Sequence, residues 1–179
     1  WNRTFISVFL TNGMMYLGQQ MVQPLITSYA KTLGATETVI GLVASAFTIT
    51  AILLKVISAP AIDTYNKKYL LCGAMCIMGT AYLGFAFAGT VPAIFGFRLL
   101  QGCGQAFTTS CCLALATDAL PQKKLGQGIG VFALAQSVCQ AIGPTLGKFI
   151  QSIFGYGTTF LTAAVFMFLG AFCALLIRN

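Results

Sequence analysis

The sequence contains no histidine, and only three of its 179 residues are acidic. Histidine and clustered carboxylates supply most general acids, general bases and metal ligands in proteins. We therefore expect no hydrolytic triad, no metal site and no cofactor, and we do not expect an enzyme. Charged residues of both signs make up 7% of the chain, against about 25% in an ordinary soluble domain. So little charge favours a chain that lies in a lipid bilayer.

The ten Lys and Arg residues give a net charge of +7. They stand singly or in pairs between long apolar runs and form no continuous basic patch, which argues against nucleic-acid binding. The cysteines are an odd number, and all of them fall inside apolar runs, which favours small packing residues over disulfides. They are Cys72, Cys76, Cys103, Cys111, Cys112, Cys139 and Cys173.

Polar breaks divide the chain into six apolar runs, each close to the length of about 20 residues that a spanning helix needs. The sequence therefore predicts an all-α integral membrane protein with a six-transmembrane-helix bundle. The predicted helices cover residues 3–29, 38–62, 69–88, 93–118, 126–154 and 158–177. The connections are short, so we expect neighbouring helices to be antiparallel.

Basic residues collect at one set of helix ends, and short loops rich in Lys and Arg face the cytoplasm. The rich side holds Arg3, Lys67, Lys68, Lys123, Lys124 and Arg178, and the other side holds Lys31 and Lys148. We expect a multi-pass protein of the plasma or inner membrane with both ends of this segment in the cytoplasm.

Three predicted helices carry amide-rich stripes, because residues three, four and seven apart share one helix face. The stripes are Asn12, Tyr16, Gln19 and Gln23; Arg98, Gln101 and Gln105; and Gln136 and Gln140. Hydrogen bonds between helices would use the same residues, at about 1 kcal/mol each. Three stripes together favour a shared wet cavity through which a small-molecule substrate passes.

Two cations lie well inside predicted helices. Arg98 stands about 9 Å into the fourth helix and Lys55 about 12 Å from the cytoplasmic end of the second. Either long side chain can reach an interface. Arg98 shares a face with two glutamines, which makes it the stronger functional candidate. Three roles are open for Lys55. It can reach the lipid headgroups, contact a substrate in the cavity, or serve as an amine whose pKa falls on burial.

Three motifs resemble those of the major facilitator superfamily. The loop motif Gly-x-x-x-Asp-Arg-x-Gly-Arg-Lys corresponds to residues 59–68, where Asp63, Lys67 and Lys68 match. The motif Arg-x-x-x-Gly-x-Gly corresponds to residues 98–104. The antiporter motif Gly-x8-Gly-x3-Gly-Pro-x-x-Gly-Gly is matched by Gly130, Gly143, Pro144 and Gly147, with Cys139 and Lys148 in place of two glycines.

The resemblance implies the N-terminal six-helix half of a transporter, built from inverted repeats over residues 1–90 and 91–179. It implies a second six-helix half outside this chain and a substrate between the two halves. It also implies roles in coupling or conformational switching for Arg98, for the loop around Asp63 with Asp118 as its remaining acidic member, and for the helix containing Pro144. Lys55 is a further coupling candidate because of its position inside a predicted helix.

The branch with this antiporter motif exchanges drugs for protons, so the resemblance favours proton-coupled efflux of small amphipathic compounds by alternating access. The residues leave two alternatives. Two cations without buried carboxylates favour an uptake permease for an organic anion or a sugar. A non-transporting membrane scaffold or receptor would use the same bundle, although the polar stripes argue against it.

Overall fold

Each apolar run of the sequence forms a helix in the computed structural model, which describes residues 3–177. The elements are α1 (Arg3–Thr32), α2 (Glu37–Thr64), α3 (Lys67–Phe87), α4 (Val91–Asp118), the short 3-10 turn η1 (Gln122–Lys124) and α5 (Leu125–Leu175). Every described element is helical, and the predicted helix ends agree with the observed ends to within a few residues. The predicted all-α fold is confirmed.

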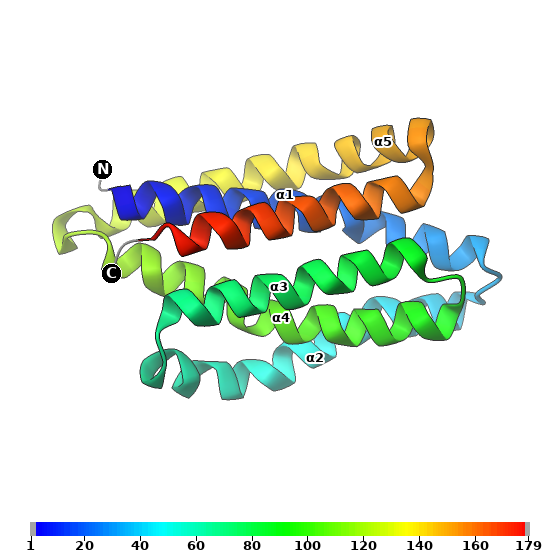
Figure 1. Cartoon of the computed structure of the whole chain (residues 1–179), viewed down its shortest axis with the longest axis horizontal. Helices are drawn as coiled ribbons and strands as arrows, with labels where there is room; N and C mark the ends of the chain where they lie inside the picture. Colours follow the sequence, from blue (N-terminus) through cyan, green and yellow to red (C-terminus); the bar gives the residue numbers. More distant parts are fainter. Residues whose placement is uncertain (1–2, 178–179) are drawn as a thin grey trace.

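The last helix, α5, is two helices in one. Gly155 has φ 84° and ψ 176°, a backbone conformation outside the helical region that glycine adopts without a Cβ clash. The chain reverses there, so residues 125–154 and 156–175 form two antiparallel segments (Figure 1). The sequence predicts the turn over residues 155–157, but only Gly155 is non-helical, because one positive-φ residue suffices to redirect the chain.

Local chemistry sets two other helix ends. Gly34 has φ 83° and follows α1, and the amides of Gly34 and Ala35 donate to the carbonyls of Lys31 and Ala30. This pair of hydrogen bonds is the Schellman pattern, which satisfies the last carbonyls of a helix. At the start of α3, the Asn66 side chain accepts a hydrogen bond from the Lys68 amide at 3.1 Å and caps the helix.

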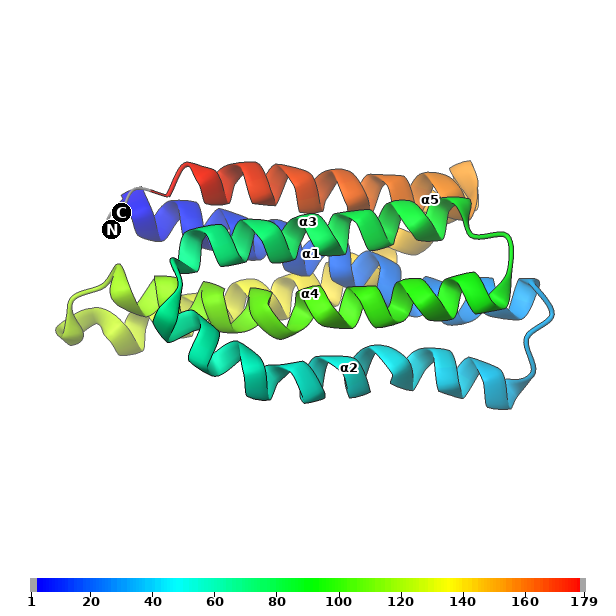
Figure 2. The same ribbon diagram turned by 60° about the horizontal axis from the view of Figure 1, so that its bottom comes forward.

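The helices lie nearly parallel to one long axis (Figures 1 and 2). α4 lies between α2 and α3, and α2 forms one edge of the bundle, where it packs mainly against α4. The two segments of α5 lie beside α1, and α5 also packs on α3. The helices with polar stripes, α1, α4 and the first segment of α5, are thereby brought together.

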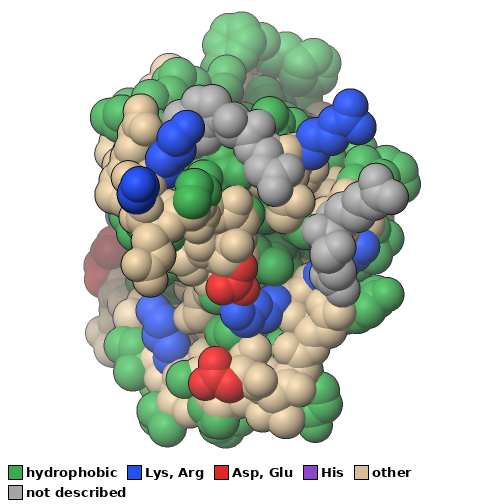
Figure 3. Space-filling model, turned by 90° about the vertical axis from the view of Figure 1, so that its left-hand side faces the viewer, with side chains coloured by type: hydrophobic (Ala, Val, Ile, Leu, Met, Phe, Trp, Pro, Cys, Tyr) green, Lys and Arg blue, Asp and Glu red, His purple; other side chains and the backbone are tan. Residues whose placement is uncertain are grey.

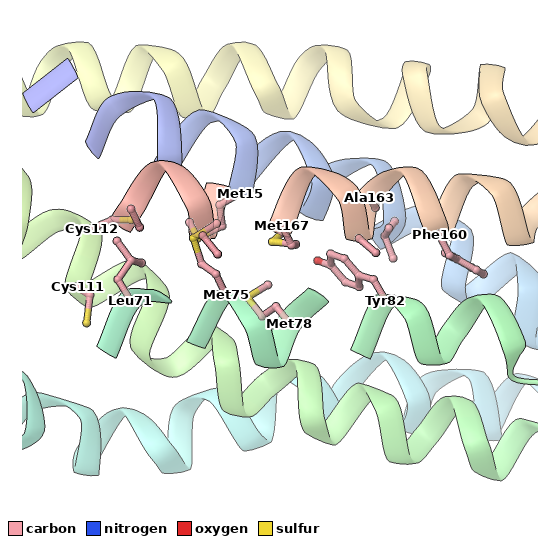
Figure 4. Packing of buried hydrophobic residues seen from close by; sticks show 14 of the residues in the cluster. Met15, Leu71, Met75, Met78, Tyr82, Cys111, Cys112, Phe160, Ala163 and Met167 are labelled. Atoms are coloured by element: carbon pink, nitrogen blue, oxygen red, sulfur yellow. The ribbon is translucent and has the colours of Figure 1, made fainter. Parts of the chain in front are cut away.

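The apolar core fills the space between α1, α3, α4 and the second segment of α5 (Figure 4). Its centre is rich in methionine and aromatic side chains, including Met15, Met75, Met78, Tyr82 and Met167, all of them fully buried. Unbranched thioether side chains fill irregular gaps between helices. Cys111 and Cys112 are also buried in this core, in agreement with the packing role that the sequence predicts for the cysteines.

The outer surface of the bundle is largely apolar. Three helical stretches of the described chain, α2, α3 and Gln122–Leu175, are long and apolar enough to cross a membrane. α1 and α4, which carry two of the polar stripes, are less apolar. α2 buries only a narrow strip and exposes large side chains such as Leu53 and Val56. Exposed apolar surface on this scale requires lipid or another protein surface to cover it.

Charge gathers at one end of the bundle. The end at which α1 begins also holds the α2–α3 and α4–α5 connections, and Lys and Arg side chains crowd this end around a few acidic groups (Figure 3). At the opposite end, Lys31 pairs with Glu37 at 2.8 Å, and both side chains are exposed. The middle of the bundle is left almost free of charge.

Candidate functional site

A polar groove runs along one side of the bundle, between α1, α2, α4 and the first segment of α5. It consists of two adjoining hollows of about 250 and 330 Å³. Tyr16 of α1 and Thr109 of α4 line both hollows, so the two are continuous at this point. Together they are large enough for a small organic molecule.

Both hollows have mixed polar and apolar walls, and they differ in charge. The smaller one has Leu113, Ile129 and Phe132 on its walls and Asn12 and Gln136 as its amides. The larger one contains two further amides and the groove's lysine, and it is lined by Gln19, Phe47, Thr48, Ala51, Ile52, Lys55, Gln105 and Ala106 besides the shared pair. The groove is thus cationic at one end and uncharged at the other.

Several polar atoms of the groove have no hydrogen-bond partner in the chain. The Oε1 atoms of Gln19 and Gln105 and the Nδ2 atom of Asn12 are buried and unpaired within the described residues. A buried polar group without a partner costs about 1–3 kcal/mol. Hydrogen bonding between helices does not account for these three side chains, which would have to turn toward the groove to find water or a ligand as a partner.

Arg98 forms a separate network behind the groove. Its Nη1 atom donates to Gln101 Oε1 at 3.0 Å and to Gln23 Oε1 at 3.4 Å, and Gln101 Nε2 donates to Tyr82 Oη at 3.2 Å. The guanidinium carbon lies 5.4 Å from the centre of the Phe47 ring, within the range of a cation–π contact. The network joins α1, α2, α3 and α4.

The positive charge of Arg98 has no carboxylate beside it. The side chain is 1% exposed, and Gln101 and Tyr82 are completely buried. Its hydrogen-bond acceptors are neutral amides, and its Nε atom has no partner in the described chain. A charge held in this way is expensive, and such residues in spanning helices usually serve function.

The structure divides the predicted substrate-path residues into two groups. Asn12, Tyr16, Gln19, Gln105 and Gln136 line the groove. Gln23, Arg98 and Gln101 belong to the buried network and do not line the groove, while Gln140 is exposed on α5. The predicted role of this second group in the substrate path stays a prediction.

The two glycines of the α4 motif bring α4 close to both neighbours. A Cβ atom at Gly102 would lie 2.7 Å from the Phe47 carbonyl oxygen of α2, and one at Gly104 would lie 2.7 Å from the Ala74 carbonyl oxygen of α3. These distances are shorter than any normal contact. The motif therefore fixes α4 between α2 and α3, with Arg98 one turn before Gly102.

The α5 motif makes the α1–α5 contact within this half. A Cβ at Gly147 would lie 3.0 Å from the Met21 carbonyl carbon, and one at Gly143 would lie 3.2 Å from that of Gln20. Cys139, which replaces a motif glycine, donates from Sγ to the Gly13 carbonyl at 3.6 Å. Small residues let helix backbones approach in this way.

The other α5 motif positions lie differently. Gly130 has no atom within 4 Å of the place where its Cβ would stand. Lys148 is exposed on α5, and Pro144 is partly buried inside the helix. These positions do not contribute to the close contact with α1.

The loop predicted to hold a charge network contains one ion pair. Lys67 Nζ lies 2.5 Å from Asp118 Oδ2, so the start of α3 is tied to the end of α4. Asp63 is exposed and makes no hydrogen bond or ion pair in the described chain, and Lys68 contributes only its backbone amide to the Asn66 cap. The predicted role of this loop in switching stays a prediction.

We expect the Lys67–Asp118 pair to add little to stability. The Asp118 side chain is 57% exposed, and exposed pairs contribute about 0.2–1 kcal/mol. Thermal unfolding of the single variants Lys67→Gln and Asp118→Asn and of the double variant will measure the coupling. A coupling energy above about 2 kcal/mol would contradict the assignment of an exposed, weakly coupled pair.

Sequence reasoning missed Tyr82 and Phe47, which complete the Arg98 network, and Thr109, which joins the two hollows. Tyr82 and Phe47 lie in apolar stretches of the sequence, where no pattern marks them as functional. Thr109 stands four residues after Gln105, so it extends the polar stripe of α4 and could have been found from the helical repeat.

Comparison with known proteins agrees with this architecture. The family profile described as "Major Facilitator Superfamily" matches residues 8–179. The chain is 28% identical over 167 residues to the multi-drug resistance efflux pump PmrA of Streptococcus pneumoniae and covers 41% of its length. It is 25% identical over 172 residues to multidrug resistance protein 1 of Bacillus subtilis and covers 44% of that protein. The matches include 91% and 96% of this chain.

Solved structures share the fold. The POT family transporter PepTSo superimposes with a TM-score of 0.88 at 14% identity, over 98% of this chain and 37% of that chain. The human organic anion transporter MFSD10 superimposes with a TM-score of 0.81 at 18% identity, over 99% of this chain and 47% of that chain. The chain therefore spans less than half the length of these relatives and structures, and it belongs to the major facilitator superfamily.

Proposed function

We propose that this chain is the N-terminal half of a secondary transporter that exports small amphipathic compounds by alternating access. The observation that carries the proposal is the groove, in which amide side chains of α1 and α4 that make no hydrogen bond through Asn12 Nδ2, Gln19 Oε1 and Gln105 Oε1 line a hollow with apolar and aromatic walls. Such walls suit an apolar molecule, and the amides suit its polar groups. The relative PmrA, described as a multi-drug resistance efflux pump, supports export as the direction.

A second six-helix half completes the transporter in this proposal. The groove is open along the side of the bundle, and α2 beside it exposes apolar side chains such as Leu53 and Val56. The two halves would close over the substrate and rock about it. We further propose that residues 1–90 and 91–179 form the two inverted repeats of this half.

We propose that both ends of the segment face the cytoplasm. The end of the bundle where α1 begins carries Lys67, Lys68, Lys123 and Lys124, whereas Lys31 at the other end is paired with Glu37. The excess of basic side chains at one end supports this orientation.

We also propose that export is coupled to the movement of protons in the opposite direction. The only acidic residues, Glu37, Asp63 and Asp118, all lie at helix ends, so none can carry a proton at mid-membrane depth. The proton site is then a carboxylate of the second half, or coupling passes through the charge of Arg98. A substrate and a proton must favour opposite conformations for exchange to occur.

An uptake permease for an organic anion or a sugar is the second candidate. It is favoured by Lys55 in the groove and by Arg98 behind it, in a half whose membrane interior has no carboxylate. A non-transporting scaffold is less well supported, because it would not explain why amide groups along the groove lack hydrogen-bond partners.

The test is a transport assay with the full-length protein in proteoliposomes. Export should follow an imposed pH gradient for a cationic dye such as ethidium, and it should stop when the gradient is collapsed. Dye export at the same rate with and without the pH gradient would show that transport is not coupled to protons. Accumulation of a sugar or carboxylate without dye export would favour the permease. If no compound moves in liposomes that hold folded protein, the scaffold reading replaces both.

A further inference from the structure

We infer that Lys55 and the amides around it form an anion subsite, so that the substrates of this transporter include amphipathic molecules carrying a carboxylate, besides any cationic compounds that it exports. This inference rests on the proposed function, because it assigns a substrate class to the same groove. It goes further by stating which end of the groove holds which part of the molecule.

Lys55 is a cation without a counter-ion in this half. Its side chain is exposed in this half, lines the larger hollow and makes no hydrogen bond or ion pair in the described chain. Glu37 is bound to Lys31 and Asp118 to Lys67. Asp63 stands eight residues further along the same helix, about 12 Å away along its axis. An unpaired lysine within a spanning helix marks a substrate or ion pathway.

The surroundings of Lys55 suit an anion. Gln19 and Gln105 line the same hollow, and their side-chain amides make no hydrogen bond in the described chain. Nothing therefore fixes which end of either amide faces the groove, and both can turn an N–H group toward a bound oxygen. An ammonium with two amide donors matches the acceptor-only oxygens of a carboxylate.

The other end of the groove has no charged residue, and its large apolar side chains can contact the apolar body of a ligand. Leu113, Ile129 and Phe132 line the smaller hollow, which adjoins the larger one at Tyr16 and Thr109. Along α4, the step from Gln105 to Leu113 is eight residues, or about 12 Å. A molecule of that length can place its carboxylate beside Lys55 and a ring or chain beside Phe132.

A binding experiment with two matched compounds tests the subsite. Dansyl-phenylalanine and its methyl ester share one fluorescent apolar body and differ in the carboxylate. The full-length protein in nanodiscs should bind the acid more tightly than the ester. Lys55→Gln should weaken binding of the acid by roughly 10- to 100-fold, the effect of losing a hydrogen-bonded charge, and leave the ester unchanged. Lys55→Arg should retain most of the preference.

Lys148→Gln is the matched control, because it removes an exposed lysine from a spanning helix outside the groove. It should change neither binding constant. Equal binding of acid and ester by the unaltered protein would overturn the inference and would indicate that a carboxylate of the second half already neutralises Lys55. Equal loss of both compounds in Lys55→Gln would also overturn it, because the lysine would then only shape the groove.

The same two compounds separate this inference from the proposed function. Preferential binding of the acid without movement across proteoliposomes would leave the anion subsite standing and overturn transport. Movement of acid and ester at equal rates and with equal affinity would leave transport standing and overturn the subsite.

Discussion

Replacing Gly147 with alanine is expected to destabilise the protein by about 1–3 kcal/mol, the usual cost of overpacking a filled contact. The new Cβ would lie 3.0 Å from both the Cα and the carbonyl carbon of Met21 and would collide with its carbonyl oxygen. These are backbone atoms of α1, so no side-chain rotation can relieve the contact. The α1–α5 pair would have to separate, and the groove between these helices would change shape.

The measurement is thermal unfolding of the full-length protein in detergent, together with dye transport. Gly130→Ala is the matched control, since it makes the same chemical change on the same helix where no atom lies within 4 Å. It should leave the free energy of unfolding unchanged or raise it by up to about 1 kcal/mol, because alanine has the higher helix propensity. Equal behaviour of the two variants would show that α1 and α5 are not in close backbone contact.

Replacing Arg98 with methionine is expected to separate stability from function. The guanidinium is buried among neutral partners, so the substitution removes a costly buried charge but leaves the acceptor oxygens of Gln101 and Gln23 without their donor, at about 1–3 kcal/mol for a buried group. The two effects oppose each other, so the unfolding temperature should change little. Transport should fall by about tenfold or more, a loss of at least about 1.4 kcal/mol in the transport barrier.

Tyr82→Phe is the control for the packing of this network. It removes only the hydroxyl that accepts from Gln101 and should cost about 1 kcal/mol of stability while transport continues. If Arg98→Met transports normally, the charge has no functional role. If it unfolds, the charge is structural and the reasoning from neutral partners is wrong.

The helices could be predicted from sequence because each is bounded by a strong local signal. Gly34 gives a left-handed helix end, Asn66 gives a cap, and Gly155 gives a reversal. These signals need no knowledge of distant residues. The continuation of α5 through Tyr156 and Gly157 was missed because three turn-forming residues in a row do not reveal which of them leaves the helix.

The groove could be predicted only in part. Periodicity placed Gln19, Gln105 and Gln136 on inward faces, and all three line the groove. It also grouped Arg98 and Gln101 with Gln105, but the structure holds these two in a buried network, where Tyr82 and Phe47 contact them. A helical repeat gives the direction of a side chain and not its partner, so a network that joins four helices is beyond its reach.

Lys55 shows the same limit. Its position in the sequence is compatible with headgroup contact, with substrate contact and with a buried amine. The structure places it on the wall of the larger hollow with Gln19 and Gln105. This position follows from the close approach of α4 to α2, where Gly102 of α4 meets Thr50, about one and a half turns before Lys55 on α2. That packing depends on three helices at once.

The central claim is that the groove holds water and substrate. Single cysteines at positions 19 and 136, in full-length protein whose native cysteines, including the seven of this half, are replaced, can be treated with a membrane-impermeant maleimide from each side of the membrane. We expect labelling at both positions, with protection by a transported compound, and no labelling of a cysteine at the exposed position Thr80 on α3. If positions 19 and 136 stay unlabelled from both sides while the protein remains folded, the groove is closed to water and the proposed substrate path is wrong.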